Sequence, residues 1–217
     1  MPKCLIKLHG KALIEYQIES LRNAGIDKIA IVTGYKRELI NDKGDKEFHN
    51  NRWASTNMVS SLSCAREWLL DEPCVVSYSD IFYETKAVED LISDQSPLAI
   101  TYDLNWLLQW KQRFENPLTD AETFRLDDNR NVIEIGQTPK TLEEIQGQYM
   151  GLLRFTPESW TAVEKIRENL RPEENDKIHM TGLLQKIIDA NKLKIQGIPF
   201  SGVWGEIDTQ TDLNIYA

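Results

Sequence analysis

The strongest constraint on the fold is an alternation of amphipathic segments with short runs that are almost wholly apolar. Residues 11–25 carry apolar side chains at helical spacing and end at Gly25. The run at 28–35 follows directly, and similar runs stand at 74–78 and 97–103, each after a helical segment. Because a helix that leads into a fully apolar strand is the repeating unit of a covered parallel sheet, the pattern predicts an α/β fold.

The rest of the chain is less regular. Residues 41–57 are polar and predict a loop, and residues 122–136 predict a β-hairpin with its turn at Asp127 to Asn131. Further strands are expected at 148–155 and 194–200, helices at 60–71, 87–94, 159–170 and 182–192, and a short helix or lid at 105–118. We therefore predict one domain over 1–217: a Rossmann-like, mixed and mostly parallel sheet flanked by helices, with a small antiparallel insertion.

The charge balance limits the classes of partner. The 217 residues include 25 Lys and Arg against 34 Asp and Glu, a net charge of −9. Nucleic acids and anionic membranes attract basic faces, so neither is expected as a partner, whereas a small phosphorylated ligand needs only local positive charge. The three cysteines, Cys4, Cys64 and Cys74, have no metal-type spacing and favour a reducing compartment. No apolar run is long enough to span a bilayer, so we expect a cytoplasmic protein; no feature indicates an oligomeric state.

Acidic residues follow two of the predicted strands. Asp80 comes directly after the strand at 74–78, and Glu206 and Asp208 follow the strand at 194–200 after a short turn. Ligands of open α/β sheets bind at the carboxyl ends of strands, and Mg²⁺ prefers carboxylate oxygens. The alternative is that these acids cap the following helices, which is the more frequent role for a single Asp. Taken together, the three residues favour a magnesium site.

Two further segments could bind a nucleotide. Lys3 follows a proline that stiffens its loop, and a lysine held there can meet a phosphate as a point charge, although most lysines are solvated surface residues. Asn57 and Ser60 stand at a predicted helix start, where free N–H groups and an amide can read the edge of a base. An ordinary helix cap explains the second segment equally well.

Aromatic residues suggest an acceptor surface. Trp106, Trp110 and Tyr149 could form a surface for a cationic or amino-bearing molecule. Core packing is the alternative, since that is where most tryptophans lie.

Several motifs resemble the sugar-phosphate nucleotidyltransferases. PKCLIKLHGKALIEYQIESL resembles the second half of the family signature, YSDI matches the strand-end Asp that binds Mg²⁺, and WGEID matches the second metal motif. TNMVSSL, QYMGLLRF and the closing WGEIDTQTDL are most similar to the small cytidylyltransferases that activate phosphocholine, phosphoglutamine and related phosphate monoesters. The likeness covers nearly the whole chain.

The resemblance implies a nucleotide-diphospho-sugar transferase fold and a Mg²⁺-dependent transfer of CMP from CTP to a small phosphate monoester, with release of pyrophosphate. The implied roles are catalysis for Lys3, Asp80 and Asp208; nucleotide binding for Lys3, Asn57, Ser60 and Asp80; metal binding for Asp80, Glu206 and Asp208; and acceptor binding for Trp106, Trp110, Lys140 and Tyr149. The sequence leaves open CTP against UTP and the identity of the acceptor.

Two departures from the family pattern matter. The strand and Gly-rich loop that precede the Pro-Lys pair in relatives are absent, so we expect a chain truncated relative to the family and a gap in the sheet beside residues 29–33 or 75–78. Relatives often place a lysine at the position of Thr138, for which Lys140 is the candidate substitute. These departures keep a second function open, that of a catalytically impaired nucleotide-binding or regulatory homologue.

Overall fold

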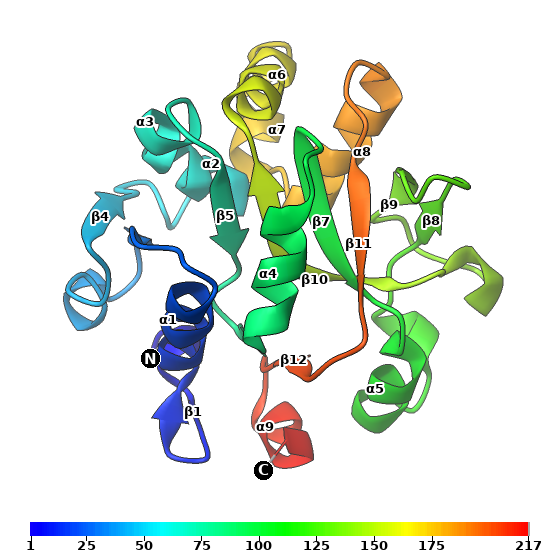
Figure 1. Ribbon diagram of the computed structural model, residues 1–217, viewed down its shortest axis with the longest axis horizontal. Coiled ribbons are helices and arrows are strands. Elements are labelled where there is room, and N and C mark those ends of the chain that lie inside the picture. Colours follow the sequence, from blue (N-terminus) through cyan, green and yellow to red (C-terminus); the bar gives the residue numbers. More distant parts are fainter. Residues whose placement is uncertain (217) are drawn as a thin grey trace.

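A four-stranded mixed sheet lies at the centre of the molecule. The computed structural model describes residues 1–216, and in it the strand order is β11-β7-β10-β5 (Figure 1). These strands are β5 (Cys74–Ser77), β7 (Leu98–Asp103), β10 (Gln148–Phe155) and β11 (Gln196–Phe200). β11 runs parallel to β7, whereas β10 runs antiparallel to both of its neighbours. Three of the four strands therefore point the same way, as the sequence predicts.

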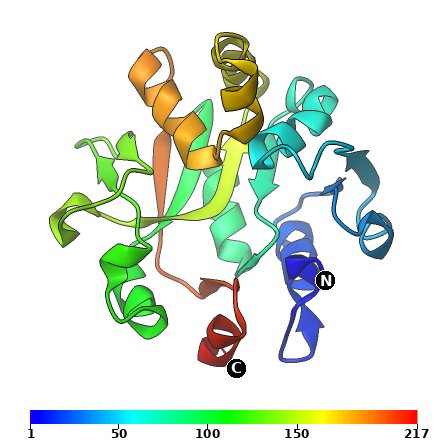
Figure 2. The ribbon, with the colours of Figure 1, turned by 180° about the vertical axis from the view of Figure 1, so that it is seen from behind.

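Helices cover both faces of this sheet. α1 (Leu13–Asn23) and α4 (Thr85–Ser93) contact each other and pack on one face. α6 (Pro157–Glu168) and α8 (Met180–Ala190) pack on the other, as the reverse view shows (Figure 2). Along β7, Leu98 and Ile100 enter the second layer and Ala99 the first, and all three are fully buried. Burial on both faces explains why the strand sequences are continuously apolar.

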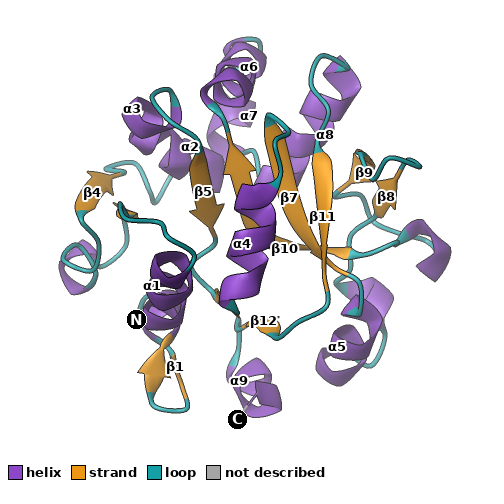
Figure 3. Cartoon of the chain, in the orientation of Figure 1, coloured by secondary structure: helices purple, strands orange, loops and turns teal. Residues whose placement is uncertain are grey.

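The remaining elements surround the central sheet (Figure 3). The predicted helix at 60–71 is instead two short helices, α2 (Met58–Leu62) and α3 (Arg66–Leu69), joined by a 3-10 turn. The predicted hairpin at 122–136 is confirmed as β8 (Phe124–Leu126) and β9 (Val132–Ile135), and the helix expected at 105–118 is present as α5 (Trp106–Arg113). Further strands and helices around the sheet are β1 (Lys7–Leu8), β2 (Lys11–Ala12), β6 (Ile81–Tyr83), α7 (Pro172–Lys177), β12 (Trp204–Glu206) and α9 (Gln210–Tyr216).

A separate pair of strands corrects one expectation and confirms another. The predicted loop at 41–57 contains β4 (Lys46–His49), which pairs in parallel with β3 (Ala30–Thr33). In β4 only Phe48 is buried, which is why the segment reads as polar. Within residues 1–216, β3 pairs with β4 and β5 with β10, and no ladder joins β3 to β5. The expected interruption of the sheet beside residues 29–33 and 75–78 is therefore present.

The two edges at this interruption share the same layers. Val32 of β3 and Val76 of β5 pack against one core cluster, and Ile31 and Val75 pack against the other. The side chains of β3 thus alternate between the same two faces as those of β5, although the backbones are not paired. In the described part of the chain, no helix has the length and apolar character needed to cross a membrane.

Gly151 gives a test of the strand geometry. It has φ +77°, and a Cβ there would lie 2.8 Å from the Tyr78 ring. We expect Gly151→Ala to lower the free energy of unfolding by about 1–3 kcal/mol, because a side chain is strained at positive φ and meets the ring.

The matched control is Gly182→Ala. Gly182 lies inside α8, and the nearest atom to its added Cβ is Ile178 Cγ1 at 3.7 Å. This substitution should raise the free energy of unfolding by about 1 kcal/mol, because alanine favours a helix interior. Urea titration measures both values, and an unchanged midpoint for Gly151→Ala would contradict the strand geometry.

Candidate active site

Three residues far apart in the sequence meet at one end of the sheet. Lys3 Nζ lies 2.9 Å from Asp80 Oδ2 and 2.5 Å from Asp208 Oδ1. Asp80 lies just beyond β5, and Asp208 just beyond β12. The structure thus brings together the three residues for which the sequence predicts a catalytic role.

A short antiparallel ladder holds the acidic residues together. β12 pairs with β6, with Glu206 opposite Ile81, and the backbone N–H of Ile207 donates to the Asp80 carbonyl at 2.9 Å. This register places Glu206 and Asp208 beside Asp80. One carboxylate oxygen from each of the three lies within 4.8 Å of the others. An all-carboxylate set of this size fits a hard divalent cation such as Mg²⁺.

The charges at this site influence one another. Burial raises the pKa of Glu206 to about 7; Asp208 and Asp80 add to this rise, whereas Arg113 opposes it. Burial lowers the pKa of Lys3, but its hydrogen bonds to Asp208 and Asp80 outweigh that effect and hold the pKa above its ordinary value. The ammonium therefore stays charged at neutral pH.

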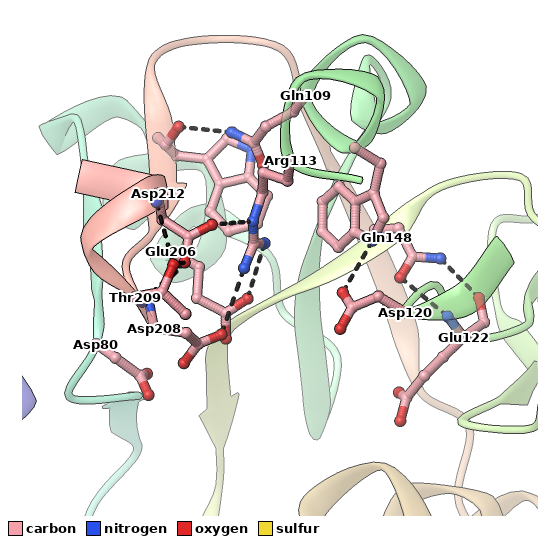
Figure 4. Close-up of polar contacts among 12 residues, drawn as sticks. Asp80, Gln109, Arg113, Asp120, Glu122, Gln148, Glu206, Asp208, Thr209 and Asp212 are labelled. Carbon is pink, nitrogen blue, oxygen red and sulfur yellow. Dashed lines mark hydrogen bonds and ion pairs between the residues drawn. The ribbon is translucent and has the colours of Figure 1, made fainter. Parts of the chain in front are cut away.

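Arg113 is a buried cation beside these acids. Its side chain is 2% exposed, and it pairs with Asp212, Glu206 and Asp208 (Figure 4). Asp212 also accepts hydrogen bonds from the backbone N–H groups of Asp208 and Thr209, at 3.2 and 2.8 Å. Sequence reasoning missed Arg113 because its partners lie 93 to 99 positions further along the chain and nothing local marks it.

Asn57 and Ser60 have protein partners. Asn57 Oδ1 accepts from the Met58 N–H at 2.7 Å and caps α2, which is the alternative role that the sequence allows. Its Nδ2 donates to the Lys177 carbonyl at 3.2 Å, and Ser60 Oγ donates to the Asn175 carbonyl at 3.3 Å. A contact of either residue with a base stays a prediction.

The four predicted acceptor residues lie in different environments. Trp106 and Trp110 are 5% and 4% exposed and pack within the core, because α5 turns its apolar face inward. This burial agrees with core packing, the alternative that the sequence leaves open, and a role of the two tryptophans in acceptor binding stays a prediction. Tyr149 packs edge-on against Tyr78, and its buried hydroxyl has no hydrogen-bond partner among residues 1–216. Lys140 is exposed, and its backbone N–H donates to Glu144. Among residues 1–216, no hydrogen bond or ion pair joins Lys140 to Asp80, Glu206 or Asp208.

Two partly shielded carboxyl groups beside this region, those of Asp120 and Glu122, are further residues that sequence reasoning missed. Asp120 accepts from Trp110 Nε1 at 3.1 Å, and Glu122 Oε1 accepts from the Thr181 hydroxyl at 3.3 Å. Burial raises the pKa of both carboxyls above the ordinary range. Gln148 fixes the Glu122 backbone by donating to its carbonyl at 2.6 Å (Figure 4).

Comparison with known proteins identifies the family of the chain. The family model of the MobA-like NTP transferase domain matches residues 1–119. The CTP:phosphoglutamine cytidylyltransferase of Campylobacter jejuni is 34% identical over 99% of this chain and 90% of its own length. The choline-phosphate cytidylyltransferase of Streptococcus pneumoniae is 39% identical over 31% of each chain.

The fold also matches a solved structure. The inositol-1-phosphate CTP transferase of T. maritima superimposes with a TM-score of 0.77 at 18% identity, covering 100% of this chain and 85% of that one. This likeness supports a central mixed sheet with flanking helices. The chain belongs to the MobA-like NTP transferase family and is a nucleotidyltransferase.

Proposed function

We propose that this chain transfers CMP from CTP to a small phosphate monoester and releases pyrophosphate, with Mg²⁺ as cofactor. The observation that carries the proposal is the meeting of Lys3 with Asp80 and Asp208 beside Glu206 at the ends of the strands. The Campylobacter relative is a CTP:phosphoglutamine cytidylyltransferase and the Streptococcus relative a choline-phosphate cytidylyltransferase, which supports a cytidine nucleotide and an acceptor that resembles phosphoglutamine or phosphocholine. A cytoplasmic location is part of the proposal, and the three free thiols support it.

The transfer needs no covalent enzyme intermediate, so catalysis depends on positioning the reactants. An oxygen of the acceptor phosphate attacks the α-phosphorus, the bond to the β-phosphate bridging oxygen breaks, and pyrophosphate leaves with that electron pair. The nucleophile is already anionic, so no residue has to remove a proton from it. Catalysis then rests on alignment and on neutralising the charge of three phosphates and the acceptor.

Each residue of the site has a part in that neutralisation. Asp80, Glu206 and Asp208 would hold Mg²⁺, which when bound offsets phosphate charge and orients the reacting groups. The Lys3 side chain is 47% exposed, so it can turn from the carboxylates toward triphosphate oxygens. Its contacts with Asp80 and Asp208 keep the ammonium beside the proposed metal ligands, where the triphosphate would bind.

The acceptor end is proposed at Tyr149, Tyr78 and Glu122. In the described part of the chain the buried Tyr149 hydroxyl has no hydrogen-bond partner, and the Tyr149 ring packs against that of Tyr78, two residues before Asp80. Burial raises the pKa of both tyrosines, and the charge of the Glu122 carboxylate adds to that rise. A carboxylate beside aromatic rings suits the amide or cationic end of an acceptor. Trp106 and Trp110 would then shape this region through packing.

A second candidate function is a nucleotide-binding or regulatory protein with impaired catalysis. The observation that favours it is the interruption between β3 and β5, near the segment that carries Lys3. Tight CTP binding with no pyrophosphate release, measured by calorimetry and a coupled assay on the same preparation, would support it over the enzyme.

The proposed function makes three predictions, and the first concerns the carboxylates. Asp80→Asn and Asp208→Asn should each reduce pyrophosphate release from CTP and phosphocholine or phosphoglutamine by at least about 100-fold, because each removes a charged oxygen ligand. The control is Asp90→Asn, which removes a surface ion pair with Lys86 on α4 and should keep wild-type rates. Wild-type turnover by either site variant would remove that residue from the site.

The second prediction concerns pH. The pKa of Glu206 is about 7, above its usual value, so Glu206 is largely protonated below neutrality and a cation must displace that proton. The affinity for Mn²⁺ should therefore rise up to about tenfold per pH unit below 7 and level off above it. In Glu206→Gln this rise should be missing. A flat wild-type profile between pH 5 and 7 would contradict the assignment of Glu206 as a ligand.

The third prediction concerns Lys3, whose removal should act in opposite directions on two ligands. Lys3→Met should bind Mn²⁺ more tightly than wild type without nucleotide, because the ammonium no longer occupies Asp80 and Asp208. The same variant should bind CTP more weakly, because a phosphate partner is lost. Titration calorimetry measures both constants. Lys7→Met, at an exposed lysine, is the control and should change neither. Equal shifts of both constants in one direction would contradict the proposed exchange.

A further inference from the structure

We propose that Arg113 is a positioning residue that orients Glu206 and Asp208 toward a bound divalent cation. This inference rests on the proposed function, since it assumes that the carboxylates bind the cation. It concerns a residue on α5, outside the segments that carry the acids themselves.

The guanidinium is fixed by all three of its nitrogens. Nε lies 2.9 Å from Asp212 Oδ1, Nη1 lies 3.2 Å from Glu206 Oε2, and Nη2 lies 3.3 Å from Asp208 Oδ2. The ring centroids of Trp110 and Phe114 lie 5.3 and 5.2 Å from its central carbon. A planar fork with every nitrogen engaged and aromatic rings nearby has little freedom to move.

The contacts of Arg113 and Lys3 divide the carboxylate oxygens between them. Arg113 meets Glu206 Oε2 and Asp208 Oδ2, whereas Lys3 meets Asp208 Oδ1 and Asp80 Oδ2. Arg113 therefore leaves Asp208 Oδ1, Glu206 Oε1 and both Asp80 oxygens to other partners. With 2% of its side chain exposed against 47% for Lys3, Arg113 is the permanent counter-ion and Lys3 the exchangeable one.

Asp212 extends this support to the backbone. One of its oxygens pairs with Arg113, and the other accepts from the N–H groups of Asp208 and Thr209. The direction of the Asp208 side chain is thereby tied to the guanidinium through both the backbone and the carboxylate. Outer partners of this kind commonly set the geometry of metal ligands.

Charge and geometry predict opposite effects, which makes the proposal testable. If Arg113 acted only as a charge, replacing it by a neutral residue would strengthen the attraction of the acids for a cation. If it positions the ligands, the same replacement weakens cation binding. Arg113→Lys keeps the charge and loses the fork, so it should weaken binding only if the geometry matters.

A second buried arginine supplies the matched control. The side chain of Arg154 is 8% exposed and donates to the carbonyls of Asp94 and Ser96, at 2.7 and 2.6 Å. It lies opposite Val75 near the start of β5, whereas Asp80 follows the end of that strand. Substituting it disturbs a buried guanidinium without touching the acidic residues.

The experiment measures Mn²⁺ binding without nucleotide, by electron paramagnetic resonance, for the wild type and for Arg113→Lys, Arg113→Met, Asp212→Asn and Arg154→Lys. The proposal expects the two Arg113 variants and Asp212→Asn to bind Mn²⁺ about 10–100-fold more weakly. Arg154→Lys should bind like the wild type, even where thermal unfolding shows a loss of stability. Arg113→Lys keeps the test decisive where Arg113→Met fails to fold, because it preserves the charge, whereas loss of the Asp212 charge would by itself weaken cation binding.

Three outcomes overturn the inference, and they are distinguishable from one another. Wild-type affinity or tighter binding in folded Arg113→Lys overturns the role of Arg113 and leaves the proposed function standing. An equal loss of affinity in Arg154→Lys also overturns it, because the effect then follows general destabilisation. If the wild type itself binds no Mn²⁺, the proposed metal site and this inference both fail.

Discussion

The balance of charge around Asp80, Glu206 and Asp208 is the interaction on which the rest of the site depends. Three carboxylates within 4.8 Å of one another repel, and burial makes the repulsion stronger. The positive charges of Lys3 and Arg113 offset it. The raised pKa of Glu206 shows that the offset is incomplete, since burial and the neighbouring acids still favour its protonated form. A site with residual negative charge of this kind is prepared for a further cation.

The fold supplies this balance from separate places. The β6–β12 ladder fixes the acids relative to one another, α5 contributes the buried arginine, and the first residues of the chain contribute the lysine. The central sheet, packed on both faces, holds these elements in register. Binding at the carboxyl ends of strands follows the general rule for α/β sheets.

Features with a local signal could be predicted from the sequence. The apolar strands β5 and β7 follow from their composition, and Asp80 and Asp208 from their place after strands. β4 could not be predicted, because only Phe48 of that strand is buried. The role of Arg113 could not be predicted, because its ion-pair partners lie more than ninety positions further along the chain and no local sequence pattern marks it. For Trp110 the sequence allows both an acceptor surface and core packing, since helical spacing does not indicate which face of the helix turns inward.

The account is tested most directly by a crystal structure with CTP and Mn²⁺, using the anomalous signal of manganese. It predicts one anomalous peak bound by oxygens of Asp80, Glu206 and Asp208. Lys3 should have moved to a phosphate oxygen, and Arg113 should keep its present contacts. A manganese peak away from these carboxylates, or Lys3 still bridging Asp80 and Asp208 with the nucleotide bound, would contradict the account.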